Sequence, residues 1–432
     1  MKTGIYRYIL TLLAILLLVS PGIRGEEKRD SVVVSLITCW PGSEIYELCG
    51  HEALRVRGTV NGEPVDSVWN YGVFDYNAPG FVYRFVKGET DYMLAGYPFA
   101  WFLPEYQNQR RRVVEQDLNL SADQAMRLVE MLQKEGKPEN RTYRYNYVRD
   151  NCATRIVDRI DSVAGSPVVY PDSIGYGTFR REMRAYHKNY PWYQFGIDLA
   201  LGAGIDMPIR GREEMFVPVE MYKKAEHARF ADGRPLIRAT RVLNEGSDDA
   251  VLPPTNIWLS PLAVSWIWFV IVGLVSLWMF LRNKLARWIY ALWFGICGLA
   301  GCLIAFLVFV SVHEATSPNV LLLWLNPLQL LMSISIWSRK IKGVSFAVAY
   351  YNIVALTCLL IVWAFQKQSA NPAFFPLMGS TLLLAVTFAV VAPKYYGSNK
   401  RDGLTFNKKA LDASFKRGGL RRTTGTGKKR SK

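Results

Sequence analysis

The sequence predicts an α+β domain outside the cytoplasm, followed by an all-α transmembrane bundle of about five helices. The 432 residues change in composition near residue 256. Residues 26–255 mix charged, aromatic and apolar side chains as a globular domain does, whereas 256–393 are almost continuously apolar with short polar loops. A basic tail at 394–432 holds 13 Lys or Arg against two Asp, so it carries a formal +11 of the chain's +16. The rest of the chain is therefore only mildly basic.

The first 25 residues resemble a secretory signal, with Lys2 and Arg7 ahead of the apolar stretch from Tyr8 to Ser20. Such a segment directs the next part of the chain out of the cytoplasm. Residues 21–25 make a poor cleavage site, so two alternatives stay open: a removed signal peptide or a retained N-terminal anchor. Both place the next domain in the periplasm.

Strands are predicted in the first part of the soluble domain. Ser31 to Thr38 is rich in β-branched residues, which favour strands. Two further runs, Ala53 to Val60 and Val65 to Phe74, flank the dipeptide Asn61-Gly62. Because this dipeptide between strands is a strong hairpin signal, we expect the two runs to pair.

Helices are predicted further along the soluble domain. Residues 122–135 have apolar side chains at helical spacing, and Ser121 stands where an N-cap is expected. An aromatic strand is expected from Tyr143 to Tyr147. A second helix is predicted to begin at Cys152, because apolar residues come after it at intervals of four.

The apolar half contains five stretches near the roughly 20 residues that a helix needs to cross a bilayer. Loops 282–287 and 338–342 and the tail are basic, whereas loops 313–319 and 366–372 have few positive charges. The positive-inside rule then places the tail in the cytoplasm and the soluble domain in the periplasm of a bacterial inner membrane. The expected spans are 258–281, 288–312, 319–337, 344–365 and 373–393.

The basic tail is more simply explained by anionic lipid than by nucleic acid. It comes directly after a predicted span, where a basic segment interacts with the charged cytoplasmic leaflet. No base-reading motif accompanies it. We therefore expect no nucleic-acid partner, and the sequence specifies no oligomeric state.

Cys152 has the surroundings that a reactive thiol needs. It comes after Asp150-Asn151, two good N-cap residues, so its sulfur is expected at a helix N-terminus, where backbone N–H groups and the helix dipole lower a thiol pKa. The same N–H groups, with Asn151 as the cap, mark a candidate oxyanion region. The alternative is that Cys152 only begins the buried face of the helix.

His51 is the best candidate for a base acting on this thiol. It lies beside Gly50 at the start of a predicted strand, and a Cys with a His is the minimum set for a thiol nucleophile. A base needs an orienting partner, and the next strand offers either Asn70 or Asp75. His187 and His227 lie in basic stretches that we expect to be exposed.

Two further cysteines precede the predicted strand of His51. Cys39 and Cys49 lie at the ends of one short loop, so two alternatives stay open: a disulfide that leaves Cys152 unpaired, or free thiols. No His-x-x-x-His or Cys-x-x-Cys spacing occurs outside the predicted spans. We therefore predict no metal site and no cofactor.

These motifs resemble those of a known family. Gly50-His51, with Asp150-Asn151-Cys152 about a hundred residues later, is similar to the permuted papain-like thiol fold of the lecithin:retinol acyltransferase and NlpC superfamily. With the aromatic strand 69–75 and the segment 323–327 in the apolar half, the chain more closely resembles the lipoprotein N-acyltransferase family of Bacteroides-type bacteria.

The resemblance implies an acyltransferase. In such an enzyme Cys152 takes an acyl chain from a membrane phospholipid as a thioester, and His51 is the general base. The chain then passes to the α-amino group of a diacylglyceryl-cysteine lipoprotein. Phospholipid and lipoprotein are thus the expected donor and acceptor.

Three polar residues in the apolar half are candidates for lipid binding. His313 and Glu314 lie in an external loop, and Asn326 lies within a predicted span, where polar groups usually have a partner or a ligand. The alternative for His313 and Glu314 is that they end a helix at the interface.

Two other functions compete with acyl transfer. The same Cys152 and His51 suit a membrane-anchored cysteine hydrolase, either a peptidoglycan amidase or peptidase or a phospholipase. A non-enzymatic membrane scaffold with a structural Cys152 is the third alternative. Transfer of an acyl group to an amine, rather than release of fatty acid, separates the first function from the second.

Overall fold

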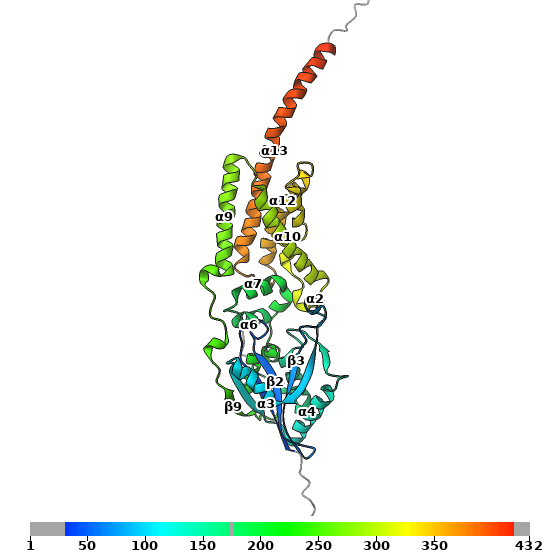
Figure 1. Cartoon of the computed structure of the whole chain (residues 1–432), viewed down its shortest axis with the longest axis vertical. Helices are drawn as coiled ribbons and strands as arrows, with labels where there is room; N and C mark the ends of the chain where they lie inside the picture. The colour runs from blue at the N-terminus through cyan, green and yellow to red at the C-terminus, as the bar shows by residue number, and fades with distance from the viewer. Residues whose placement is uncertain (1–30, 173–176, 419–432) are drawn as a thin grey trace, which may run out of the picture.

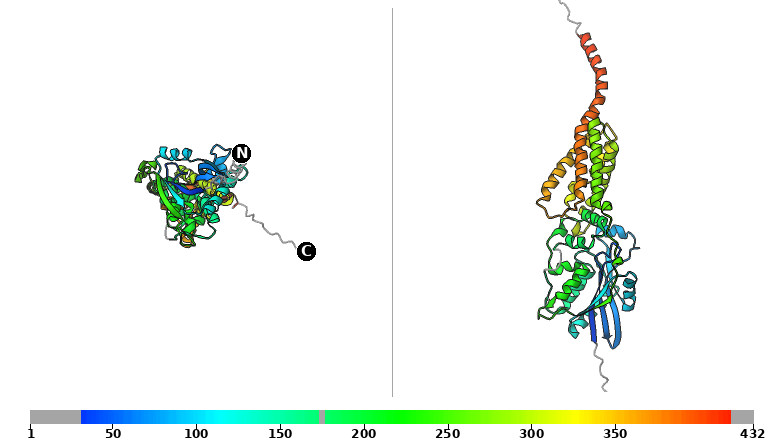
Figure 2. Two further views of the ribbon diagram at one scale, coloured as in Figure 1. Left: turned by 90° about the horizontal axis from the view of Figure 1, so that it is seen from below. Right: turned by 90° about the vertical axis from the view of Figure 1, so that its left-hand side faces the viewer.

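A computed structural model of the chain describes residues 31–172 and 177–418, with side chains described up to residue 397. The predicted signal or anchor at 1–25 and the end of the basic tail lie outside the described residues. An α+β domain and a helical bundle lie one after the other along the long axis of the molecule (Figure 1). The two perpendicular views in Figure 2 show the same arrangement.

A seven-stranded sheet organises the soluble domain, in the order β6-β4-β3-β2-β1-β5-β9, and every neighbouring pair is antiparallel. The hairpin predicted at Asn61-Gly62 is confirmed, since both residues have positive φ angles and join β2 to β3. The strands are β1 (Ser31–Cys39), β2 (His51–Val60), β3 (Glu63–Val73), β4 (Asp91–Pro98), β5 (Val113–Leu118), β6 (Thr142–Arg144) and β9 (Ile237–Asn244), with a small separate pair, β7 (Val168–Val169) and β8 (Arg229–Phe230).

Helices cover both faces of the sheet. Leu36 on β1 packs in one core with the apolar faces of α4 and α5, whereas its neighbour Ile37 packs in another core under α3. The bounds of the domain's helices are α2 (Phe81–Lys87), α3 (Phe99–Asn108), α4 (Ala122–Glu135), α5 (Cys152–Ala164), α6 (Phe179–Tyr186), α7 (Pro191–Ala200), η1 (Ala203–Asp206), η2 (Gly211–Phe216) and α8 (Pro218–His227).

The helix predicted at 122–135 is confirmed as α4, with Ser121 as its N-cap. The Ser121 hydroxyl accepts from the Gln124 backbone N–H, and the Gln124 side chain accepts from the Ser121 N–H, which completes a capping box. The helix predicted at Cys152 is confirmed as α5. The expected aromatic strand shrinks to β6, because the chain turns at residues 147–149, between the bridged Asn146 and Asp150, just before α5.

The described residues hold four helices long and apolar enough to cross a membrane, not about five. They are α9 (Pro261–Arg282), α10 (Arg287–Phe309), α12 (Lys342–Trp363) and the first part of α13 (Phe374–Gly418), Phe374–Gly397. Shorter elements lie before and between them: η3 (Asp248–Ala250), η4 (Ile257–Leu259), η5 (Glu314–Thr316), η6 (Val320–Leu323) and α11 (Gln329–Ser335).

The predicted span 319–337 is an interrupted segment rather than a continuous helix. It consists of η6 and α11, separated by Asn326-Pro327, where the proline ring lacks the N–H that a helix needs. Its start lies at the domain end of the bundle, because Asn319 donates to the Leu199 carbonyl. Its end lies at the opposite end, where the Arg287 guanidinium is 5.5 Å from the Trp337 ring centre.

Buried polar side chains satisfy the backbone at this interruption. Asn326 and Gln329 both donate to the Trp324 carbonyl, and Gln329 also donates to Asn352 at 3.2 Å. Non-helical backbone inside a bilayer is tolerated only where protein covers it in this way. The segment also packs closely on α10, where Gly298 and Gly301 face it without side chains.

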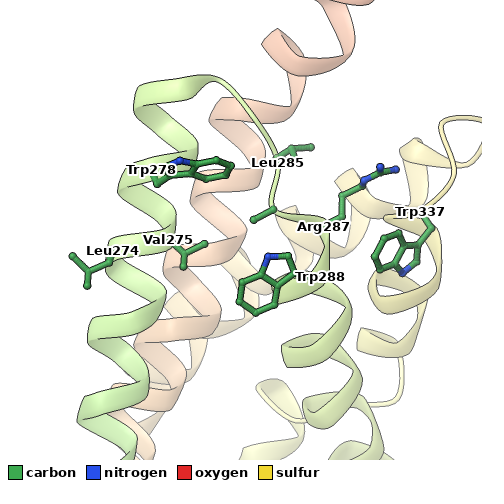
Figure 3. A pocket seen from close by; sticks show the side chains of 8 residues that line it. Leu274, Val275, Trp278, Leu285, Arg287, Trp288 and Trp337 are labelled. Carbon is green, nitrogen blue, oxygen red and sulfur yellow. The ribbon is translucent and has the colours of Figure 1, made fainter.

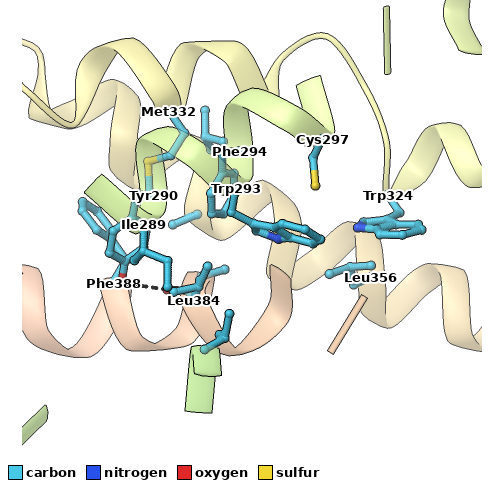
Figure 4. Packing of buried hydrophobic residues seen from close by; sticks show 14 of the residues in the cluster. Ile289, Tyr290, Trp293, Phe294, Cys297, Trp324, Met332, Leu356, Leu384 and Phe388 are labelled. Carbon is cyan, nitrogen blue, oxygen red and sulfur yellow. Dashed lines mark hydrogen bonds between the residues drawn. The ribbon is translucent and has the colours of Figure 1, made fainter. Parts of the chain in front are cut away.

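An aromatic core holds the bundle together (Figure 4). The Tyr290 hydroxyl donates to the Leu384 carbonyl on α13 at 3.2 Å, and the Trp293 and Trp324 indoles both donate to Thr381. A hollow of about 620 Å³ opens at the end of the bundle that is distant from the soluble domain (Figure 3). It is lined by Trp278, Trp288 and Trp337 among others.

Two contact regions fasten the soluble domain to the bundle. At the first, α2 lies against the end of α10, and the Val312 N–H donates to the Lys87 carbonyl at 2.9 Å. At the second, α6, α7 and η1 rest on the bundle loops: the Asn371 amide donates to Asp198, and Phe195 contacts Phe374. Both regions are visible below the bundle in Figure 1.

Candidate active site

The candidate site lies where β2 and β3 separate. The last β2–β3 pair on this side is Leu54 with Trp69, so the start of β2 is not paired with β3. Between Asn70 and Val73 the β3 register shifts against β4, which places one extra residue in β3 as a bulge. Gly72 in this bulge has a φ of 93°, a backbone conformation that favours glycine. The first turn of α5 packs against the separated strands.

Cys152 and His51 meet at this opening. A Cβ placed on Gly72 would lie 3.6 Å from the Cys152 Cβ and 4.0 Å from the His51 Cε1. Cys152 and His51 are both partly buried. Sequence reasoning selected both residues, and the fold brings them to the same place from elements a hundred residues apart.

Asn70, not Asp75, contacts the imidazole. The His51 Nε2 and the Asn70 Oδ1 are 2.6 Å apart. Because an amide oxygen only accepts, Nε2 carries the proton, which leaves Nδ1 as the nitrogen able to take a proton. Asp75 is exposed and accepts instead from the Asn77 backbone N–H within its own turn.

Tyr97 is a residue of the site that sequence reasoning missed. The Asn70 Nδ2 donates to the Tyr97 hydroxyl at 3.1 Å, which helps to hold the amide in place. Tyr97 lies on β4, beside β3 in the sheet. Only the pairing of the two strands brings it near, and no pattern in the sequence identifies that pairing.

Asn151 is the N-cap of α5. Its Oδ1 accepts from the Ala153 and Thr154 backbone N–H groups, each at 3.0 Å. Its Nδ2 donates to the Tyr147 and Phe216 carbonyls. The side chain is therefore committed to holding the start of the helix and is not free to donate to an oxyanion.

Burial keeps the thiol and the imidazole neutral. Burial raises the pKa of Cys152 to about 12, although backbone N–H groups of Glu52, Ala153 and Cys152 itself face the sulfur and lower it. We expected the helix N-terminus to dominate, but desolvation outweighs it. Burial also lowers the pKa of His51 to about 4, against the opposite effect of Asn70. Both shifts favour a neutral thiol beside a neutral imidazole.

A second thiol–imidazole contact lies nearby. The Cys49 sulfur is 3.5 Å from the Tyr147 hydroxyl and 4.0 Å from the His187 Nε2. His187 was expected to be exposed, but it is buried, because its Nδ1 pairs with Gln194 at 2.8 Å and its ring packs against Tyr193. His227 is exposed, as expected.

The Cys39–Cys49 disulfide is not formed. Both thiols are free, and they lie in different apolar clusters. Cys39 packs with Phe102 and Tyr106 beneath α3, whereas Cys49 packs near Tyr147. Among the described residues no group of three or more His, Cys, Asp or Glu side chains is arranged to hold a metal ion.

Of the three candidate residues of the apolar half, two lie at the junction with the soluble domain and the third, Asn326, lies apart from them. The His313 Nε2 is 2.8 Å from the Phe85 carbonyl on α2, and Glu314 forms an exposed ion pair with Arg149 at 3.0 Å. Both therefore help to fasten the domain to the bundle. Asn326 is buried inside the bundle at the interrupted segment, so the structure does not bring it to Cys152.

Comparison with family models covers both parts of the chain. The model of the Lnb N-terminal periplasmic domain matches residues 24–178, which include His51, Asn70 and Cys152. The model of the Lnb transmembrane domain matches residues 254–394. The chain belongs to the Lnb family. No curated protein and no solved structure matches this Lnb chain.

Membership of the Lnb family agrees with the membrane topology. A periplasmic domain joined to four apolar helices is the arrangement of a multi-pass inner-membrane protein. In this Lnb chain the site at Cys152 therefore lies on the periplasmic side of the bilayer.

Proposed function

We propose that the chain is a lipoprotein N-acyltransferase that uses a thioester on Cys152. The observation that carries the proposal is the meeting of Cys152, His51 and Asn70 in a domain that is fastened directly to a membrane bundle. A nucleophile for phospholipid esters has to lie near the bilayer surface. The membership of the Lnb family supports the same function.

In the first half-reaction the Cys152 sulfur attacks an ester carbonyl of a phospholipid while His51 takes the thiol proton on Nδ1. The Cys152 and Glu52 backbone N–H groups, which face the sulfur, are the candidates for stabilising the developing oxyanion. The C–O bond of the ester then breaks, and His51 returns the proton to the departing lysophospholipid. An acyl-thioester on Cys152 remains.

In the second half-reaction the α-amino group of a diacylglyceryl-cysteine lipoprotein attacks the thioester. His51 accepts a proton from the amine, the C–S bond breaks, and the thiol is restored. The net result is one amide formed for one ester lost. Proton transfer by a positioned base of this kind contributes about 10²–10⁴-fold to a rate.

The test is intact-mass spectrometry of the purified full chain after incubation with phospholipid. We expect an acyl adduct that hydroxylamine removes and that is absent from Cys152→Ala. Adding a lipopeptide with a free α-amino group should discharge the adduct onto that amine. Release of free fatty acid, with no transfer to the amine, would identify a cysteine hydrolase instead.

A further inference from the structure

Stacked aromatic rings form a continuous row between α2 and the neighbourhood of Cys152. Adjacent ring centres are 6.2, 5.4, 4.9 and 4.1 Å apart, and each pair is stacked. We call this row the aromatic ladder. In order, its members are Phe85, Phe81, Phe74, Tyr92 and Tyr145.

The outer end of the aromatic ladder lies at the membrane. Phe85 contacts the His313 ring, and Tyr83 on α2 contacts Phe306 on α10. On the same short helix Val82 is 61% and Tyr83 58% exposed. Apolar side chains at the end of a transmembrane helix are expected to sit at the headgroup boundary. Figure 1 shows α2 directly beside the bundle.

The inner end of the aromatic ladder lies at the thiol. Tyr92 is buried in the apolar cluster against which Phe74, Tyr145 and Cys152 all pack. Phe74 also comes two residues after Gly72, where a Cβ would lie 3.6 Å from the Cys152 Cβ. Exposure falls along the first four rings, since Phe85 is exposed, Phe81 and Phe74 are partly buried and Tyr92 is buried, and the last ring, Tyr145, is partly buried. The ladder therefore begins at the bilayer and ends beside the nucleophile.

The aromatic ladder contains no charged side chain, and the charged residues of α2 next to it form ion pairs. The cations of α2, Arg84 and Lys87, pair with Asp91 and Glu89 at 3.2 and 2.7 Å. An uncharged aromatic surface is what a hydrocarbon chain requires, because each methylene held out of water is worth about fourfold in affinity. An acyl chain that left the bilayer without an apolar surface to bind would lose about fourfold in affinity for every methylene exposed to water.

We propose that the aromatic ladder, with the exposed apolar side of α2, binds the acyl chain of a bilayer lipid and leads it to Cys152. The inference rests on the proposed function, which requires a lipid ester at this thiol. It adds the route and the contact residues. The aromatic ladder then acts by positioning the donor, and it takes no part in the proton transfers.

The first test is photolabelling in proteoliposomes of phosphatidylethanolamine and phosphatidylglycerol. The full chain with Cys152→Ala is reconstituted with a phospholipid that carries a diazirine in one acyl chain. We expect labelled peptides from residues 74–92 as well as from the bundle, and much weaker labelling there when the diazirine is in the headgroup. Labelling confined to the bundle would overturn the inference.

The second test compares two substrates on the active chain. Phe81→Ser should lower thioester formation from a long-chain phospholipid about tenfold or more and leave the reaction of Cys152 with p-nitrophenyl acetate unchanged. Trp101→Ser is the matched control, because Trp101 is 71% exposed on α3, on the opposite face of the sheet. An equal change in both reactions of Phe81→Ser, or no change in either, would overturn the inference.

The two tests separate this inference from the proposed function. A parent chain that never forms a Cys152 adduct would refute the acyltransferase, while labelling of residues 74–92 in Cys152→Ala would still support a chain-binding ladder. Conversely, a normal adduct without labelling of that segment would refute the ladder alone.

Discussion

At the scale of single residues, the hydrogen bond between Asn70 and His51 gives a sharp prediction. Asn70→Ala removes the group that holds the Nε2 proton in place, and a hydrogen bond of this kind is worth about 0.5–1.5 kcal/mol. We expect the rate of thioester formation to fall about tenfold, with little change in the apparent affinity for the phospholipid. Stopped-time intact-mass measurements over a range of donor concentrations separate the two parameters.

Two control variants accompany Asn70→Ala. Asp75→Asn should leave the rate unchanged, because Asp75 is exposed and pairs only within its turn. Tyr97→Phe should have a smaller effect than Asn70→Ala, since it loses only the hydrogen bond between the Asn70 amide and the Tyr97 hydroxyl. A larger loss in Asp75→Asn than in Asn70→Ala would show that the wrong partner has been assigned to His51.

The pKa directions predict an unusual pH profile for thioester formation. The pKa of His51 is lowered to about 4, so the ring stays neutral and able to accept a proton until the pH falls toward that value. The pKa of Cys152 is raised to about 12, so the thiol keeps its proton at neutral pH. We expect a rate that varies within about twofold over roughly pH 6–9 and declines in acid. A bell-shaped profile would indicate a thiolate–imidazolium pair instead, with an acid limb from a lowered thiol pKa and an alkaline limb from an imidazole pKa raised above its ordinary value of roughly 6.5.

Sequence reasoning selected Cys152 and His51, which the fold brings together, but it did not show how they are held. Cys152 and His51 carry local signals: the caps before a helix and a glycine before a strand. The choice between Asn70 and Asp75 depends on the bulge in β3 and on Tyr97 from β4, which are non-local features. The thiol pKa was predicted in the wrong direction, because burial is a property of the packed domain.

At the scale of elements, the contact between α10 and the interrupted segment predicts a position-specific cost. A Cβ on Gly301 would lie 2.4 Å from backbone atoms of Asn326, so Gly301→Ala forces the two elements apart. Overpacking of this kind costs about 1–3 kcal/mol. The thermal unfolding temperature of the purified protein in detergent should fall.

The matched control is Gly273→Ala on α9, where a Cβ would have nothing within 4 Å. There the added methyl group should be neutral or slightly stabilising, since alanine is the better helix former. Equal effects of the two substitutions would mean that the segment does not pack closely on α10.

The elements that sequence reasoning found are those with local signals. The capping box of Ser121 and Gln124 and the apolar spacing of α4 lie within one stretch of chain, so both can be recognised in the sequence. Strands β5 and β9 were not identified, because Asp117 pairs with Ser35 and Ala239, far away in sequence. The prediction of a fifth continuous span was wrong, because hydropathy reports apolar composition and does not detect the break in the helix at Pro327. The permuted papain-like relationship stays a prediction.

At the scale of the whole molecule, a buried ion cluster joins the domain to the bundle. Asp198 accepts from Arg180, Arg184 and Asn371 at 2.8, 3.0 and 2.9 Å, and Arg180 is fully buried. Asp198→Ala leaves that guanidinium with Asp206 as its remaining carboxylate. Breaking a buried pair costs about 3–5 kcal/mol, so we expect a large fall in the unfolding temperature of the full chain.

Arg149→Ala provides the comparison for Asp198→Ala. It removes the other ion pair at the junction, which is exposed and should change stability by less than about 1 kcal/mol. If both substitutions lowered the unfolding temperature equally, burial would not be the reason that the Asp198 cluster stabilises the junction.

The double attachment of the domain, through α2 and through α6, α7 and η1, has a consequence for the membrane itself. In the proposed reaction, a thiol held at one height over one surface would draw its donor from the outer monolayer of the inner membrane alone. Each turnover of the proposed reaction leaves a single-chain lipid in that monolayer, and the acyl chain that was removed becomes the third chain of a lipoprotein. Sustained activity would therefore reduce the area of the outer monolayer relative to the inner one and enrich it in lysophospholipid. Continued turnover would then depend on how fast lipids cross the bilayer and how fast lysolipids are re-acylated.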